Sequence, residues 1–191
     1  ATPDEIAELG RLGVEVLCKP WSPSLATWLS RNGASLDAAM LCRHYVAAPH
    51  LSLLRRLAPR ARITFDTVDL HFLREQRAAE HGDNRALARQ ARLSRKRELE
   101  LISAVDATFV VSPVEQALLR ELAPGAQVEL LSNVHEVHGR AAGAAGRRGV
   151  VFVGGFAHPP NVDAAHWLVE AILPALQARG LDIPIHLIGD I

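Results

Sequence analysis

One junction constrains the fold more than any other stretch of this chain. Four apolar residues, Val150–Val153, run into the pair Gly154-Gly155, and after two prolines Asn161 and Asp163 open an amphipathic helix. A strand, a glycine turn and a helix N-terminus are typical of α/β proteins that cradle an anionic, usually phosphorylated, ligand. Glycine lets the ligand approach the backbone, and the first helical turn presents unpaired N–H groups. The junction therefore predicts a phosphate-binding turn in an α/β protein.

Periodicity and capping signals predict alternating strands and helices along the chain. The predicted strands are 14–18, 37–43, 62–66, 106–111, 127–131, 150–154 and 184–188. The predicted helices are 3–12, 24–32, 50–57, 70–80, 85–104, 113–122 and 161–178. Ser112 and Glu115 form a capping box at the start of helix 113–122, and Pro174 should bend or shorten the last helix. Such strands require a parallel sheet with helices on both faces.

The composition bounds the class of protein. A chain of 191 residues with 49% hydrophobic content buries a core of one domain, or of one and a fraction. Its zero net charge gives no indication of nucleic-acid binding. Cys18 and Cys42 form no disulfide pattern, which favours a reducing compartment. No apolar run approaches the roughly 20 residues of a membrane helix, and no export signal is visible. We expect a cytoplasmic protein.

A glycine- and alanine-rich segment, residues 139–149, divides the chain. It shows no apolar periodicity, so it predicts a linker between residues 1–138 and residues 150–191. Because the chain starts without Met and stops just after a predicted strand, we expect a piece of a longer protein. The second part, with about two strands, cannot form its own core. It should dock on the first part, dimerise with a neighbouring molecule, or be poorly ordered.

Three segments carry a family resemblance: FDTVDLHFLREQR, ELELISAVDATFVVSPVEQALL and VVFVGGFAHPPNVDAAHWLVEAILPAL. Together they resemble bacterial family 4 (group 1) glycosyltransferases. The resemblance implies a GT-B architecture, in which two Rossmann-like domains face each other across a cleft. Residues 1–138 would be the later part of the acceptor-side domain, and residues 150–191 the beginning of the donor domain. Such enzymes usually retain the anomeric configuration and need no metal.

The chain lacks two elements that the resemblance implies. These are the glycine-rich loop after the first strand of the first domain and a downstream motif of two glutamates that holds the donor. We therefore expect a fragment that is inactive alone. The expected reaction is transfer of a sugar from a nucleotide-diphosphate donor to a hydroxyl acceptor. Alternatives are a nucleotide-sugar 2-epimerase with the same two-domain plan and a non-catalytic Rossmann-like binding module.

The resemblance places the donor diphosphate at the glycine turn. The candidate donor-binding residues are Gly154, Gly155, Phe156, Asn161 and Asn133. Asn133 follows the last strand before the linker, near the implied cleft. The alternative interpretation is a tight strand-to-helix turn with Asn161 as the N-cap residue.

Two acids and a histidine follow the predicted strand 62–66, namely Asp66, Asp69 and His71. By resemblance, this loop lies near the acceptor hydroxyl, and a carboxylate there could accept its proton. Asp66 is the first choice for that catalytic role because it is nearest the strand end. The alternative is turn and helix-capping chemistry, which aspartate performs in many proteins.

No metal site is expected from the histidines. His135 and His138 are three residues apart without a thiol or acid pair to complete a tetrahedral set, and HEVH lacks the HExxH spacing. His158 and His166 flank the two prolines, where surface positions are the simpler interpretation. We expect no cofactor other than the nucleotide sugar as co-substrate.

A basic stripe suggests a further partner. Arg85, Arg89, Arg92 and Lys96 share one face of the predicted helix 85–104. Such a stripe could contact anionic lipid at about 1 kcal/mol per basic residue. A solvated helix face is the alternative. The expected partners are thus the sugar donor, a glycan or lipid-linked acceptor, and an anionic surface of the inner membrane contacted peripherally. A second copy of the chain is also expected through the partial second domain.

Overall fold

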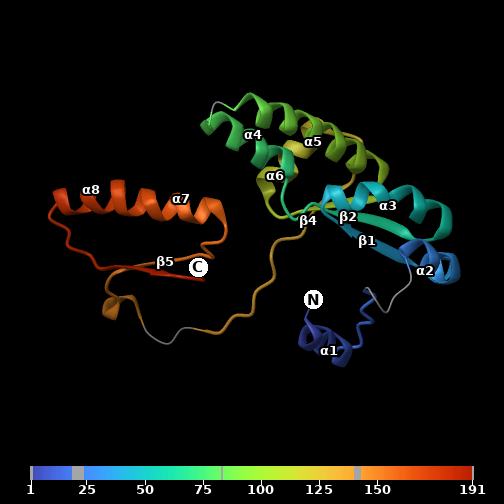
Figure 1. Cartoon of the computed structure of the whole chain (residues 1–191), viewed down its shortest axis with the longest axis horizontal. Helices are drawn as coiled ribbons and strands as arrows, with labels where there is room; N and C mark the ends of the chain where they lie inside the picture. The colour runs from blue at the N-terminus through green and yellow to red at the C-terminus, as the bar shows by residue number, and fades with distance from the viewer. Residues whose placement is uncertain (1, 19–23, 83, 140–142, 191) are drawn as a thin grey trace. The chain divides into compact units, whose positions relative to one another are not determined.

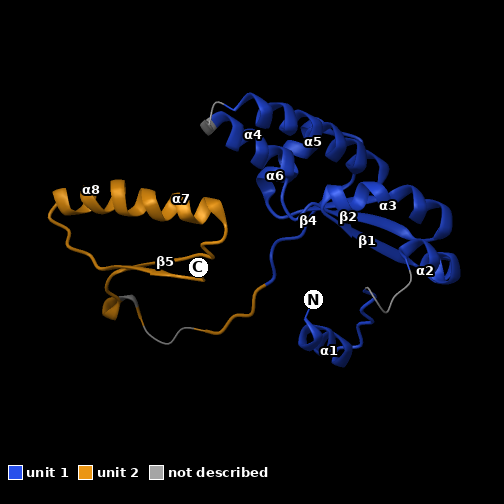
Figure 2. Cartoon of the chain, viewed as in Figure 1, with its two compact units in different colours: residues 1–134 blue, residues 135–191 orange. Residues whose placement is uncertain are grey.

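The computed structural model describes residues 2–18, 24–82, 84–139 and 143–190. The chain divides into two compact units, residues 1–134 and residues 135–191 (Figure 2). Each unit is built around parallel strands, and each is described by itself below.

Unit 1 is a mixed α/β unit with a four-stranded parallel sheet, as predicted (Figure 1). The strands lie in consecutive order: β1 (Ala38–Cys42), β2 (Arg62–Asp66), β3 (Ala107–Val110) and β4 (Val128–Leu130). Their connections are the helices α3 (His44–Leu57), α4 (His71–Gly82), α5 (Arg85–Ala104) and α6 (Pro113–Leu122). The helices α1 (Pro3–Arg11) and α2 (Leu25–Asn32) and the 3₁₀ turn Gly33–Ser35 precede β1. The arrangement is Rossmann-like.

The two faces of this sheet differ in burial. Ile63, Phe65 and Val110 are fully buried and belong to one core with side chains of α3, α5 and α6. On the opposite face, Met40 is 53% exposed. The pattern predicted helices on both faces, whereas the crossover helices described here cover one. Right-handed crossovers between strands in consecutive order place every helix on the same side, and a second covered face requires the strand order to reverse.

Most predicted elements of unit 1 are confirmed within two residues at each end. The predicted strand 14–18 is wrong, since those residues form no strand. In the described part of the chain β1 pairs only with β2, so residues 14–18 do not extend the sheet at its β1 edge. Helix α3 begins at His44 rather than at residue 50 and contains Pro49.

Unit 2 contains the parallel strands β5 (Val150–Val153) and β6 (Ile185–Ile188) and a helical segment between them. That segment is α7 (Pro159–Trp167), a π-helical turn (Leu168–Ile172) and α8 (Leu173–Ala178). Pro174 was expected to bend or shorten the helix. It lies in the first turn of α8, directly after the π turn that separates α7 from α8, in which the Leu173 N–H donates to the Leu168 carbonyl.

No described residue from 135 to 190 is buried. This agrees with the expectation that two strands and one helical layer cannot enclose a core. Part of the predicted linker, residues 140–142, lies outside the described residues, and Ala144–Gly146 form a short 3₁₀ turn. Among the described helices, none combines the length and the apolar character needed to cross a bilayer.

Replacement of Gly33 by alanine should destabilise unit 1. Gly33 is buried between α2 and β1, and a Cβ atom there would overlap the backbone carbonyl of Leu57 at the end of α3. Neither backbone can yield locally, so Gly33→Ala should lower the free energy of unfolding by about 2 kcal/mol in urea denaturation. Gly10→Ala is the control, because a Cβ atom at Gly10 meets nothing within 4 Å. Equal effects of the two changes would contradict this account.

Candidate functional site

The loops that follow β1 and β2 bring two histidines together at the carboxyl edge of the unit 1 sheet. His44 begins α3 and His71 begins α4, and their rings meet edge to face with centroids 4.9 Å apart. The ring of Tyr45 packs at 5.5 Å from His44 and 5.6 Å from His71. Both histidines are buried, whereas Tyr45 is 54% exposed. The histidine pair thus lies beneath a tyrosine at the edge where ligands bind in parallel sheets.

A fully buried carboxylate, that of Glu98 on α5, lies against both histidines. Its Oε1 atom is 3.6 Å from His44 Nδ1 and 3.9 Å from His71 Nδ1. The same oxygen accepts the His71 N–H at 3.2 Å, and Oε2 accepts the Phe72 N–H at 2.8 Å. Glu98 therefore caps the N-terminus of α4 from another helix.

A second remote carboxylate, that of Glu115 on α6, completes this cap. Its Oε1 accepts the Leu70 N–H at 3.2 Å, and its Oε2 accepts the Val111 N–H at 3.2 Å. The predicted capping box is confirmed only in part, because the Ser112 side chain accepts the Glu115 N–H while the Glu115 carboxylate bonds Leu70 and Val111. The amides of three successive residues, 70–72, are thus held by acids from α5 and α6.

Burial governs the ionisation of this cluster. It raises the pKa of Glu98 from 4.5 to about 7, against the lowering effect of the Phe72 and His71 amides. Burial also lowers the pKa of His44, and the neighbouring His71 lowers it further. The charges of Asp69 and Glu75 favour protonated Glu98. The cluster therefore exchanges a proton close to neutral pH.

Backbone strain is concentrated at the same edge. Arg43, directly after β1, has φ 66°, and Val68, two residues after β2, has φ 64°. Left-handed backbone is rare for residues with a side chain, above all for a β-branched one, and costs on the order of 1–3 kcal/mol. The Val68 N–H donates to Asp66 Oδ1 at 2.9 Å, which stabilises the turn. Strain retained at two adjacent strand ends is typical of functional sites.

The structure gives each predicted catalytic residue a defined partner. Asp66 forms the turn with Val68, and its Oδ2 accepts the Cys42 thiol at 3.9 Å. Burial and the Asp66 carboxylate raise the pKa of that thiol. Asp69 Oδ2 accepts from Arg74 at 2.7 Å, and Asp69 Oδ1 lies 3.6 Å from His71 Nδ1. The turn role of Asp66 is confirmed, and its catalytic role stays a prediction.

The predicted donor turn differs from its expected geometry. Helix α7 begins at Pro159 with His158 as N-cap residue, so the alternative that made Asn161 the N-cap is wrong. The two prolines carry no N–H, and the Gly154 and Phe156 N–H groups donate to the Ile188 and Asp190 carbonyls. The helix start therefore offers fewer unpaired amides than the sequence predicted.

Two features of that turn remain suited to a ligand. The Asn161 side chain donates to the Gly155 carbonyl at 3.0 Å and fills the space that a Cβ atom on Gly154 would need. At Gly155, by contrast, a Cβ atom meets nothing within 4 Å. Phe156 borders an apolar hollow of about 550 Å³ in unit 2. Asn133 is exposed in unit 1, so the two compact units each hold part of the predicted donor set.

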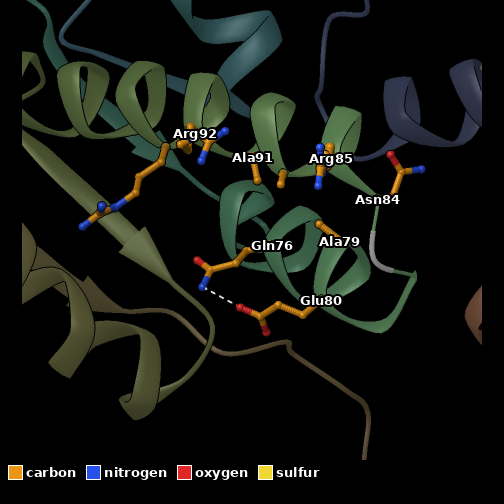
Figure 3. Close-up of a pocket in the computed structure, with 9 residues that line it drawn as sticks. Gln76, Ala79, Glu80, Asn84, Arg85, Ala91 and Arg92 are labelled. Carbon is orange, nitrogen blue, oxygen red and sulfur yellow. Dashed lines mark hydrogen bonds between the residues drawn. The ribbon is translucent and has the colours of Figure 1, made fainter.

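A second hollow, of about 450 Å³, lies between α4 and α5 (Figure 3). Arg85 and Arg92 of the predicted basic stripe line it from α5, and on α4 Gln76 donates to Glu80 at 2.9 Å. Lys96 pairs with Glu100 at 3.8 Å on the exposed side of α5. Contact of the stripe with anionic lipid stays a prediction.

Sequence reasoning missed Glu98, His44 and Tyr45. One signal for Glu98 was present, because it falls on the same face of helix 85–104 as the buried Ala91 and Leu101. An acid on the apolar face of a helix indicates a buried, partnered carboxylate. His44 had no such signal, since its helix was expected to begin later.

Comparisons of this chain with protein-family models, with curated proteins and with solved structures give no match. The geometry of the carboxyl edge of the unit 1 sheet is therefore the basis for assessing function.

The Glu98 carboxylate should make stability depend on pH. Its pKa in the folded chain, about 7, exceeds its ordinary value of 4.5, so folding binds a proton more tightly. That contribution is present below pH 4.5 and is lost as pH rises through 7, by about 3 kcal/mol at about 1.4 kcal/mol per pH unit. The stability advantage of wild type over Glu98→Gln should shrink by that amount between pH 4.5 and pH 8, measured by urea denaturation.

Histidine titration opposes this effect, because lowering the pKa of His44 makes stability rise with pH below 6.5. His44, His71, Asp69 and Glu75 are retained in the variant, so their effects cancel to first order in the comparison. Glu100→Gln, at an exposed neighbouring position on α5, should show the wild-type pH profile. An unchanged profile in Glu98→Gln would exclude Glu98 as the source.

Proposed function

We propose that the chain contributes the acceptor-side unit and part of the donor-side unit of a GT-B glycosyltransferase. The reaction is transfer of a sugar from a nucleotide-diphosphate donor to a hydroxyl group of a glycan or glycolipid. The observation that carries the proposal is the strained edge of the unit 1 sheet, where Asp66, Asp69 and His71 follow one parallel strand. The resemblance of three sequence segments to family 4 glycosyltransferases supports the same reaction.

Asp66 is suited to receive the proton of the attacking hydroxyl. Its Oδ1 is anchored by the Val68 N–H, so the direction of the carboxylate is fixed. Among the described residues, the weak thiol donor of Cys42, at 3.9 Å, is the one partner of its Oδ2. As the acceptor oxygen bonds to the anomeric carbon, its proton passes to Oδ2 and the bond to the leaving diphosphate breaks.

Asp69 and His71 support this step by holding the loop that carries Asp66. Arg74 holds Asp69 at 2.7 Å, and His71 is buried against Asp69 and Glu98. These two side chains therefore fix the loop that carries Asp66. In the proposed reaction they act by position and charge.

Gly155 is the proposed contact for the diphosphate in unit 2. The open space at its Cα lets a phosphate approach the backbone without a side chain in the way. The prolines after it limit the helix N-terminal contribution, so the positive charge that stabilises the leaving group must come from residues outside this turn.

The rival with a specific observation in its favour is a non-catalytic binding module. Asp66 in its turn and Glu98 in its cap have structural roles that need no reaction. A nucleotide-sugar 2-epimerase is a further outcome that the experiments below separate.

Replacement of Gly155 by valine should weaken binding of nucleotide-diphosphate sugars by at least tenfold. A Cβ atom at Gly155 meets nothing within 4 Å in the free protein, whereas the valine side chain occupies the space proposed for the diphosphate. Saturation-transfer NMR with a panel of nucleotide-diphosphate sugars measures the affinity. Gly125→Val is the matched control, in a turn of unit 1 that is equally open. Equal binding by both variants would remove the diphosphate from this turn.

Asp66→Asn should lower sugar transfer by about 100-fold or more, because the amide keeps the turn with Val68 but cannot take the proton. The longest natural chain that contains these residues is incubated with donors and hydroxyl acceptors, and products are identified by mass spectrometry. Asp37→Asn, at an exposed position before β1, should leave the rate unchanged. Interconversion of free nucleotide sugars would instead indicate an epimerase, and binding without turnover a binding module.

A further inference from the structure

Three side chains with metal-binding atoms meet inside unit 1. They are His44 at the start of α3, His71 at the start of α4 and Glu98 within α5. Their ligand atoms all lie within 4.8 Å of one another, and the residues are 7%, 4% and 0% exposed. A buried set of two imidazoles and one carboxylate from three different helices is more than helix capping requires, since only Glu98 of these three side chains accepts the N–H groups at the start of α4.

Two buried acceptors beside this cluster lack a donor. His44 Nδ1 and Glu75 Oε2 are buried without a hydrogen-bond partner in the described part of the chain. Glu75 follows His71 by four residues on α4, so the two side chains share one face of that helix. Buried polar atoms in native proteins are nearly always satisfied, and each exception calls for a missing water or ion. The unpaired His44 Nδ1 and Glu75 Oε2 atoms, together with the buried Glu98 carboxylate, favour a bound cation.

We propose that His44, His71 and Glu98 bind one Zn²⁺ ion. Imidazole nitrogen and carboxylate oxygen are ligands that Zn²⁺ takes, and two histidines with one glutamate form a known three-residue zinc set. A hard cation such as Mg²⁺ prefers oxygen ligands and water, which a site with two imidazoles does not offer. Water or the Asp69 carboxylate would be the fourth ligand of the ion.

The distances are close to those that coordination needs. Ligand atoms around a tetrahedral Zn²⁺ ion, at about 2.0–2.1 Å from it, are about 3.3 Å apart. Glu98 Oε1 lies 3.6 Å from His44 Nδ1, and the ligand atoms of all three residues lie within 4.8 Å of one another, so imidazole rotations bring the atoms into range. Glu98 Oε1 accepts one N–H, that of His71, and keeps a second lone pair for the ion.

Asp69 provides the outer contact that metal-binding histidines usually have. Its carbonyl oxygen lies 3.2 Å from His71 Nδ1. Coordination through Nε2 keeps this hydrogen bond, which orients the ring, whereas coordination through Nδ1 breaks it. The ion would link α3, α4 and α5 at the sheet edge. The site does not depend on sugar transfer and goes beyond the proposed function.

Zinc titration of the untagged chain at pH 8 tests the site. The chain is first stripped with a chelator, and Zn²⁺ binding is followed by competition with a chromophoric chelator. Co²⁺ in place of Zn²⁺ reports tetrahedral nitrogen and oxygen ligands by its visible absorption. We expect one ion per chain, an affinity at least tenfold lower in His44→Gln and in Glu98→Gln, and no change in His186→Gln, an exposed histidine of unit 2.

If Glu98→Gln fails to fold, His44→Gln decides the result. His44 Nδ1 has no hydrogen bond in the described residues, and replacing His44 leaves the Glu98 cap of α4 intact. Zn²⁺ should also raise the melting temperature of wild type and not that of His44→Gln. Absence of binding, or equal binding by His44→Gln and wild type, overturns the site. Equal binding by the two proteins would mean that other histidines hold the ion.

Discussion

The start of α4 depends on two carboxylates that lie far away in the sequence. Every helix begins with N–H groups that have no partner in the helix. At α4 the groups of residues 70–72 donate to Glu98 on α5 and Glu115 on α6. The loop before α4, which carries Asp66 and Asp69, is therefore positioned by the packing of three helices, and a disturbance of that packing reaches the candidate site.

This arrangement has an energetic cost that the surroundings offset. Burying the Glu98 carboxylate raises its pKa to about 7, and the two amides that it accepts oppose that rise. Arg43 and Val68 add backbone strain at the same edge. Buried charge and backbone strain of this kind are retained where a loop must hold one conformation. For that reason the proposed chemistry is placed at this edge and not in the hollow between α4 and α5.

Local signals account for the elements that the sequence predicted well. Helices 85–104 and 113–122 and strand 62–66 were predicted with the bounds that the structure shows, since periodicity and caps lie within each segment. Residues 14–18 have strand-like composition but no neighbouring strand in the described part, and pairing is not a local property. At the predicted donor turn the helix begins at Pro159, before the expected Asn161, so its first residues lack the N–H groups that a phosphate needs.

The sequence by itself determined that this chain alternates strands with helices and that polar residues follow β2, because both depend on residues a few positions apart. The tertiary structure decided that Glu98 meets His71, 27 positions earlier, and that His44 joins them. It also decided which sheet face is covered, through the order of the strands. Contacts between remote residues follow from register and packing, which no local pattern encodes.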